Sequence, residues 1–168
     1  ILLFVLLALL MASCSGSKSF YKKGQKLEKN GLNLEATNFY IESLKRKRSN
    51  EDAIIALKKT GQNILDDKFA TFYKSYTDER FKEAVYAYLD AYEFKSRVLA
   101  VGVTLSEAPY YVDYYDEARD IYIAELYDDA QEHLDNEEFK DADGLLSEIK
   151  RLDPTYKNVE SLSNFAFV

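Results

Sequence analysis

The chain has 168 residues, of which 47% are apolar and 30% are charged, a balance typical of a folded domain with a soluble surface. Its net charge of −7 is unevenly distributed, because residues 18–80 carry 14 basic and 9 acidic side chains whereas residues 81–168 carry 8 basic and 20 acidic ones. A protein that binds nucleic acid needs a basic surface to neutralise phosphates, so this acidic half argues against such a function.

Residues 1–13, ILLFVLLALLMAS, form an uncharged apolar run. A helix of that length would span roughly 20 Å, which is short of the ~30 Å hydrocarbon core of a membrane. The run has instead the length of the apolar region of a signal peptide, followed by small residues. No basic segment or initiator methionine precedes it, so we expect the sequence to begin part-way through its own leader.

The run ends at Met11-Ala12-Ser13-Cys14, which contains the only cysteine of the chain. This order resembles the bacterial lipobox, although the family prefers leucine where Met11 stands. The resemblance implies cleavage before Cys14 and acylation of its thiol and of the new amine. With Ser15 next and no acidic cluster after it, the resemblance also favours the periplasmic side of the bacterial outer membrane. A buried N-terminal core helix that happens to contain Cys14 is the alternative.

Beyond Ser19 the apolar residues recur at intervals of three and four, and strict alternation is nowhere sustained. This periodicity, together with only six glycines and two prolines, predicts an all-α fold of long helices. Asn30-Gly31 predicts the end of a helix, and Asn50, followed by two acidic residues, predicts the start of another. The basic run KRKR over residues 45–48 is typical of a solvated helix end, and Pro109 closes a non-helical break.

Three segments of the chain align with one another: NGLNLEATNFY (30–40), DERFKEAVYAY (78–88) and NEEFKDADGLL (136–146). In each, a turn precedes an alanine, and a large residue follows four positions later. The alanine allows two helices to approach closely, and the large residue fills the space beside it. The pairs are Ala36 with Tyr40, Ala84 with Tyr88, and Ala142 with Leu146.

This pattern resembles the tetratricopeptide repeat (TPR), a helix–turn–helix unit of about 34 residues. The resemblance implies that Gly24 lies on the first helix of the first repeat and that Pro154 takes the closing proline position of the last. The spacings of 48 and 58 residues between the aligned alanines depart from the family, and Arg48 and Ser96 stand where proline is expected. An array of generic helical hairpins is the alternative.

The predicted fold is therefore a set of antiparallel helical hairpins stacked as an irregular TPR-like solenoid, preceded by a signal peptide. A solenoid needs a polar capping element, and the chain stops on apolar residues, so we expect the natural protein to continue. The predicted segments are a leader (1–13), a lipidated Cys14 with a short linker (14–19), a first repeat (20–48), a long irregular hairpin (50–100), a loop (101–110), a third hairpin (111–158) and the start of a further helix (159–168).

Residues that carry chemistry are scarce. His133 is the only histidine, Cys14 would be consumed by acylation, and neither a phosphate-binding loop nor the spacing of a calcium loop occurs. The sequence therefore predicts no enzyme, no catalytic residue, no metal ligand set and no cofactor.

Tyrosine is the one enriched residue type, with 14 copies and no tryptophan in the chain. We expect most tyrosines in the core, and Tyr110, Tyr111 and Tyr114, near the loop, on a partner-binding surface. The sequence thus predicts a lipid-anchored scaffold of the bacterial envelope that binds an envelope protein or an extended peptide, and no nucleic acid. A glycan-binding uptake lipoprotein that stacks sugar rings on exposed tyrosines is the alternative.

Overall fold

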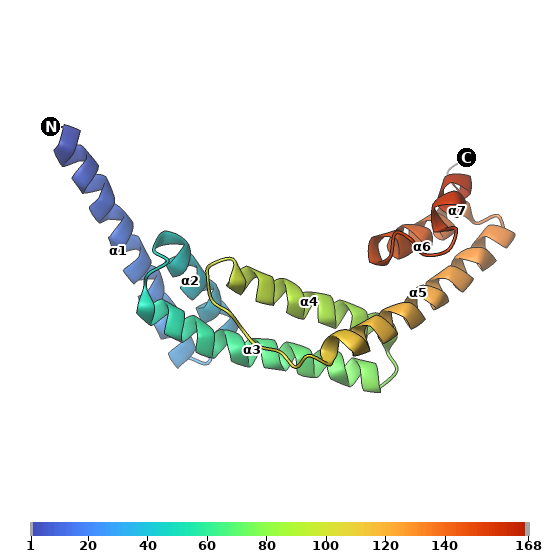
Figure 1. Cartoon of the computed structure of the whole chain (residues 1–168), viewed down its shortest axis with the longest axis horizontal. Helices are drawn as coiled ribbons and strands as arrows, with labels where there is room; N and C mark the ends of the chain where they lie inside the picture. The colour runs from blue at the N-terminus through green and yellow to red at the C-terminus, as the bar shows by residue number, and fades with distance from the viewer. Residues whose placement is uncertain (1, 167–168) are drawn as a thin grey trace. The chain divides into compact units, whose positions relative to one another are not determined.

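The computed structural model describes the backbone of residues 2–166 and the side chains of residues 16–164 and 166. Within that part of the chain every regular element is an α-helix, which confirms the predicted all-α class (Figure 1). The helices are α1 (Leu2–Lys29), α2 (Asn33–Arg46), α3 (Glu51–Thr77), α4 (Phe81–Leu99), α5 (Tyr111–Asp135), α6 (Phe139–Leu152) and α7 (Val159–Ala166).

The turns α1–α2, α3–α4 and α5–α6 share one backbone geometry. Their central residues Gly31, Glu79 and Glu137 have positive φ angles of 78°, 57° and 61°. In each turn the N–H of this residue donates to the carbonyl three positions back, and the next N–H donates to the carbonyl five positions before it. This pair of bonds is the Schellman motif, which ends a helix on a left-handed residue. The three aligned sequence segments therefore begin with the same turn.

The residues predicted to pack the hairpins are buried, except Pro154, which is exposed just after α6. The three alanines are completely inaccessible to solvent, and the large residues four positions later are at most 8% exposed. The buried set is Ala36, Tyr40, Ala84, Tyr88, Ala142 and Leu146. Each turn thus brings a small and a large side chain to the buried face of the helix that follows it, as close packing of helices requires.

The chain divides into two compact units, which are described separately. Unit 1 comprises residues 1–71 and 87–109, and unit 2 comprises residues 72–86 and 110–168. In unit 1, α1 and α2 pack side by side (Figure 1), and the closest approach lies at Gly24. A Cβ atom there would lie 2.5 Å from the ring of Tyr40, whose hydroxyl donates to Glu28 at 2.6 Å.

Helix α1 runs without interruption through residues 14–19, where the sequence predicts a linker. Ser17 is only 1% exposed and shares a hydrogen bond of 3.0 Å with the hydroxyl of Ser43. The Asn50 amide donates to both hydroxyl oxygens at 3.0 Å, and Ser43 donates to the Ser17 carbonyl at 2.8 Å. The packed body of unit 1 therefore begins at Ser17. The side chain of Cys14 lies outside the described residues.

The segment between α4 and α5 runs along α3 (Figure 1) and is packed against it. Val101, Val103 and Leu105 are each at most 5% exposed. Gln62 of α3 clamps the segment through two hydrogen bonds with the backbone of Ser106, at 2.8 and 3.0 Å. The sequence predicts a loop here, and the structure shows an ordered segment whose alternate side chains complete the core of unit 1.

In unit 2, α6 packs between α5 and α7. The buried residues of α5 and α6 recur at helical spacing and face one another, with Val159 of α7 at their edge. They are Ala118, Tyr122, Ile123, Leu126, Tyr127, Ala130, Ala142, Leu146 and Ile149. Among the residues that the structure describes, no helix is long and apolar enough to cross a membrane.

Candidate functional site

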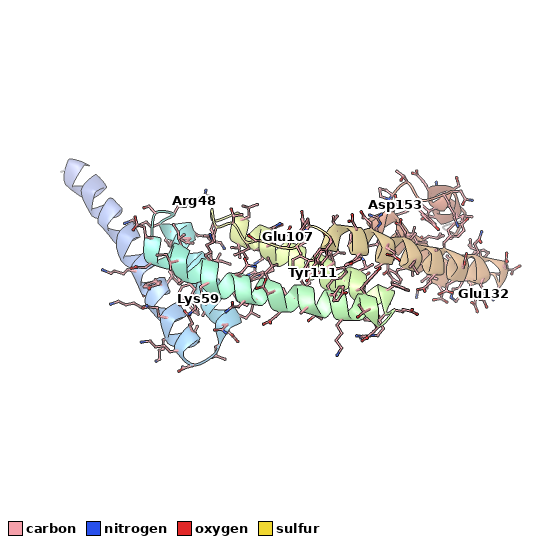
Figure 2. All side chains as sticks on the ribbon, turned by 60° about the horizontal axis from the view of Figure 1, so that its bottom comes forward. Arg48, Lys59, Glu107, Tyr111, Glu132 and Asp153 are labelled. Carbon is pink, nitrogen blue, oxygen red and sulfur yellow. The ribbon has the colours of Figure 1, made fainter. Side chains whose placement is uncertain are left out.

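The start of α5 gathers the three tyrosines that the sequence singles out. The helix begins at Tyr111, two residues after Pro109, so Tyr110 is its N-cap residue, and Tyr111 and Tyr114 lie in its first turn. The ring centroids of Tyr110 and Tyr111 are 4.9 Å apart, and those of Tyr110 and Tyr114 are 5.7 Å apart. The structure therefore brings the three predicted side chains together (Figure 2 labels Tyr111).

Two further tyrosines from the end of α3 complete the group. Tyr76 stacks on Tyr114 with a centroid distance of 4.8 Å and an interplanar angle of 22°. Tyr73 lies 5.7 Å from Tyr114 and 6.4 Å from Tyr111. We call Tyr73, Tyr76, Tyr110, Tyr111 and Tyr114 the tyrosine cluster; all five belong to unit 2.

The tyrosine cluster has a buried base and an exposed rim. Beneath it, Phe72 is fully buried and meets the ring of Tyr111 edge-on at 5.8 Å. At the rim, Tyr73 is 43% exposed and Tyr110 is 49% exposed. Rings held by a core contact and by each other lose little conformational freedom on binding, which suits a recognition surface.

The surroundings of the cluster are acidic. The Tyr76 hydroxyl donates to Glu117 at 2.6 Å, and this hydrogen bond, together with burial, raises the pKa of Tyr76 to about 12. Tyr76 consequently stays protonated at neutral pH. The first two turns of α5 also carry Asp113 and Asp116, of which Asp116 is ion-paired with Arg119 at 2.9 Å. The cluster thus combines aromatic surface with carboxylates, a composition that favours a partner with basic and apolar side chains.

A second polar network joins α4, α5 and α6 within unit 2. Tyr86 and Tyr122 both donate to the same carboxylate oxygen of Glu148 at 2.5 Å, and Arg151 donates to the Tyr86 hydroxyl at 2.5 Å. Burial raises the pKa of Glu148, but the two hydroxyl donors outweigh it, so the pKa lies below its usual value. With Tyr122 only 4% exposed, we interpret this network as a brace between helices.

His133 lies in the last turn of α5, next to Glu138. Its Nδ1 atom is 2.5 Å from the Glu138 carboxylate, and this hydrogen bond raises the pKa of His133. Asp141 brings a third ligand atom within 4.8 Å. Because both carboxylates are exposed, their charges are satisfied by solvent, and we assign the group to the surface of the turn.

Sequence reasoning found the α5 half of the tyrosine cluster and missed the α3 half. Tyr73 and Tyr76 are three positions apart and flank the apolar stripe of α3, which is the signal that could have identified them. The Glu148 network carries no comparable signal, since Glu148 and its partners Tyr86 and Tyr122 come from three different helices.

Comparison with protein-family models, with curated proteins and with solved structures finds no match for this chain. The lipobox and TPR resemblances are therefore predictions made from the residues alone.

Proposed function

We propose that this chain is a lipid-anchored helical-repeat scaffold of the bacterial envelope, which binds another envelope protein or an extended peptide through the tyrosine cluster. The observation that carries the proposal is the preorganised group of five tyrosines with an exposed rim. Tyrosine is among the residue types that contribute most to protein interfaces, because it combines apolar area with a hydroxyl.

The repeat architecture supports the scaffold role. Three Schellman turns are followed at the same distance by a buried alanine and a buried large residue, as the TPR-like solenoid requires. Helical repeats commonly present extended binding surfaces. We assign no catalytic residue, metal or cofactor to the scaffold.

The test of the binding role is crosslinking mass spectrometry on intact bacterial envelope. Tyr73→Ala combined with Tyr110→Ala removes the two most exposed rings of the cluster and should reduce the specific crosslinked partner by at least ~10-fold. Tyr92→Ala is the matched control, because Tyr92 is a 47% exposed tyrosine of unit 1, outside the cluster. Equal recovery from both variants would contradict the proposal.

The anchor rests on the resemblance to the lipobox at residues 11–14, and the proposed location is the periplasmic side of the outer membrane. In fractionated cells, Cys14→Ser should move the protein from membranes to the soluble fraction, because several acyl chains on one residue anchor stably. If the Cys14→Ser protein stays with the membranes, the anchor is wrong.

A glycan ligand is the second candidate, favoured by the exposed ring of Tyr110. Aromatic rings stack on sugars, so this alternative predicts that the protein is retained on polysaccharide gels and that Tyr110→Ala abolishes the retention. Retention of the unaltered protein, with no protein crosslink, would favour the glycan over the protein partner.

A further inference from the structure

We propose that the end of unit 1 nearest to Cys14 lies flat against anionic phospholipid headgroups. The inference rests on the lipid anchor proposed above and adds an orientation to it. The surface concerned, which we call the basic end, consists of Lys18, Lys45, Arg46, Lys47, Arg48 and Arg97.

The anchor has no flexible tether that could hold the body away from the membrane. Ser17 is buried and takes part in hydrogen bonds with Ser43 and Asn50, so the folded body starts three residues after Cys14. Even a fully extended chain spans at most ~10 Å over three residues. This distance is comparable with the ~8 Å range of electrostatic interactions at physiological salt, so charges beside Ser17 act on a membrane that holds Cys14.

The turn that contacts Ser17 carries most of the basic end. Residues 45–48 lie between Ser43 and Asn50, the two residues that bind Ser17, and all four side chains are exposed. Figure 2 shows Arg48 beside the start of α3. Lys18 and Lys47 form no ion pair within the part of the chain that the structure describes. They line a shallow cleft beside Ser17 together with Glu51 and Asp52, and without an ion pair they are available to a negatively charged surface.

Some basic side chains at this end also line a cleft in unit 1. Lys45, Arg48 and Arg97 border it, with Ile41 and Val101 as apolar lining. Glu42 also lines it and is ion-paired with Lys45 at 2.7 Å, which leaves the two arginines as the excess positive charge. Arg48 is held by the carbonyl of Ala100 at 3.2 Å, and Arg97 by the side chain of Asn38 at 2.6 Å. Fixed guanidinium groups match the oxygens of a phosphate, which is the charged group of an anionic phospholipid.

An exposed apolar residue accompanies these charges. Leu99 ends α4 with 55% of its surface exposed, next to the residue whose carbonyl holds Arg48. Basic residues combined with an apolar side chain are typical of surfaces that bind at the membrane interface. The opposite end of the α1–α2 hairpin, at Asn30-Gly31, lies ~20 Å along the helix from Ser17. Substitutions near that end serve as controls for substitutions at the basic end.

The test uses the lipidated chain, produced behind a bacterial lipoprotein leader and reconstituted into bilayers that contain brominated lipids. The chain has no tryptophan, so Leu99→Trp introduces a single reporter at the basic end. Its fluorescence should be quenched at least ~2-fold more in bilayers with phosphatidylglycerol than in pure phosphatidylcholine, and 0.5 M salt should remove the difference. Leu34→Trp, 48% exposed in the first turn of α2, should show no such difference.

Charge substitutions test the same surface independently. Lys18→Gln with Lys47→Gln should abolish the added quenching of Leu99→Trp, whereas Lys26→Gln with Lys29→Gln, the same change of charge at the opposite end of the hairpin, should leave it intact. Equal quenching in the two bilayers, in protein that remains membrane-bound, overturns the orientation and leaves the anchor standing. A Cys14 peptide without lipid in the mass spectrum overturns the anchor, and the orientation with it.

Discussion

At the scale of single residues, Gly24 lies where α1 and α2 leave no room for a side chain. An added Cβ atom would meet the Tyr40 ring at 2.5 and 2.7 Å, and this ring is fully buried and held by Glu28. Gly24→Ala should therefore lower the free energy of unfolding by about 1–3 kcal/mol, because overpacking outweighs the gain in helix propensity. Urea unfolding followed by circular dichroism measures the change.

Gly144 provides the matched control for that substitution. It lies inside α6, and a Cβ atom there would meet nothing within 4 Å. Gly144→Ala should accordingly raise the free energy of unfolding by about 0.5–1 kcal/mol. Equal stabilisation by both substitutions would show that the hairpin is not closely packed at Gly24.

Gly24 and Ser17 also show which packing contacts can be predicted from the sequence and which cannot. The aligned alanines were identifiable because a small residue recurs at the same place in three segments, and Gly24 was identified through the resemblance to the TPR. Ser17 was not, since a serine after an apolar run is typical of a linker. Its burial depends on Ser43 and Asn50, which are 26 and 33 residues away in the chain. Only the tertiary structure reveals such a contact.

At the scale of elements, the α3–α4 turn leads us to expect that two nearby substitutions by glycine change the stability of the protein in opposite directions. Glu79 has a φ angle of 57°, in the left-handed region, where the backbone of any residue other than glycine is strained. Glu79→Gly should raise the free energy of unfolding by about 0.5–1 kcal/mol, since the relief of strain exceeds the entropy lost by glycine. Thermal unfolding measures the difference.

Glu83→Gly, in the first turn of α4, is the control for that turn. There glycine relieves no strain and costs about 1 kcal/mol of helix propensity, so the protein should become less stable. The same sign of change at both positions would argue against a strained turn at Glu79.

The brace around Glu148 predicts a pH-dependent contribution to stability. Because two hydroxyl donors favour the charged form, Glu148 has a lower pKa in the folded protein than the 4.5 of a free side chain. Its contribution is fully present above about pH 4.5 and is lost as the pH falls through the folded pKa. Glu148→Gln keeps an acceptor oxygen and removes the charge, so it should cost about 1 kcal/mol at pH 7.

Urea unfolding at a series of pH values distinguishes this brace from a general effect of charge. The difference between Glu148→Gln and the unaltered protein should shrink as the pH falls below about 4.5. Glu125→Gln, at an exposed position of α5, should change stability little at any pH. A Glu148→Gln difference that stays constant down to low pH would contradict the proposed brace.

Elements were predicted better than the contacts between them. Asn30-Gly31, Asn50 and Pro109 mark helix ends in the structure as the sequence indicates, because capping and turn chemistry is local. The tyrosine cluster was only half predicted, since its α3 members join it through packing. Residues 101–110 were predicted as a loop. Their short apolar alternation, at Val101, Val103 and Leu105, is explained by packing against α3, which the local sequence does not reveal.

At the scale of the whole molecule, the acidic half should govern how fast a partner arrives. Residues 81–168 carry 20 acidic and 8 basic side chains, and exposed charges steer encounter more than they set affinity. The association rate of a basic partner should fall as salt rises, while its dissociation rate changes little. Surface plasmon resonance with the crosslinked partner measures both rates, and a salt-independent association rate would exclude steering.

The Schellman turns have a consequence for the order in which the chain folds. Each joins two helices through a few residues, so a hairpin closes with little loss of chain entropy and depends only on neighbouring sequence. The α1–α2 hairpin can therefore pack without any residue beyond Arg46. Asn50, at the start of α3, then joins the formed hairpin through its hydrogen bonds to Ser17 and Ser43.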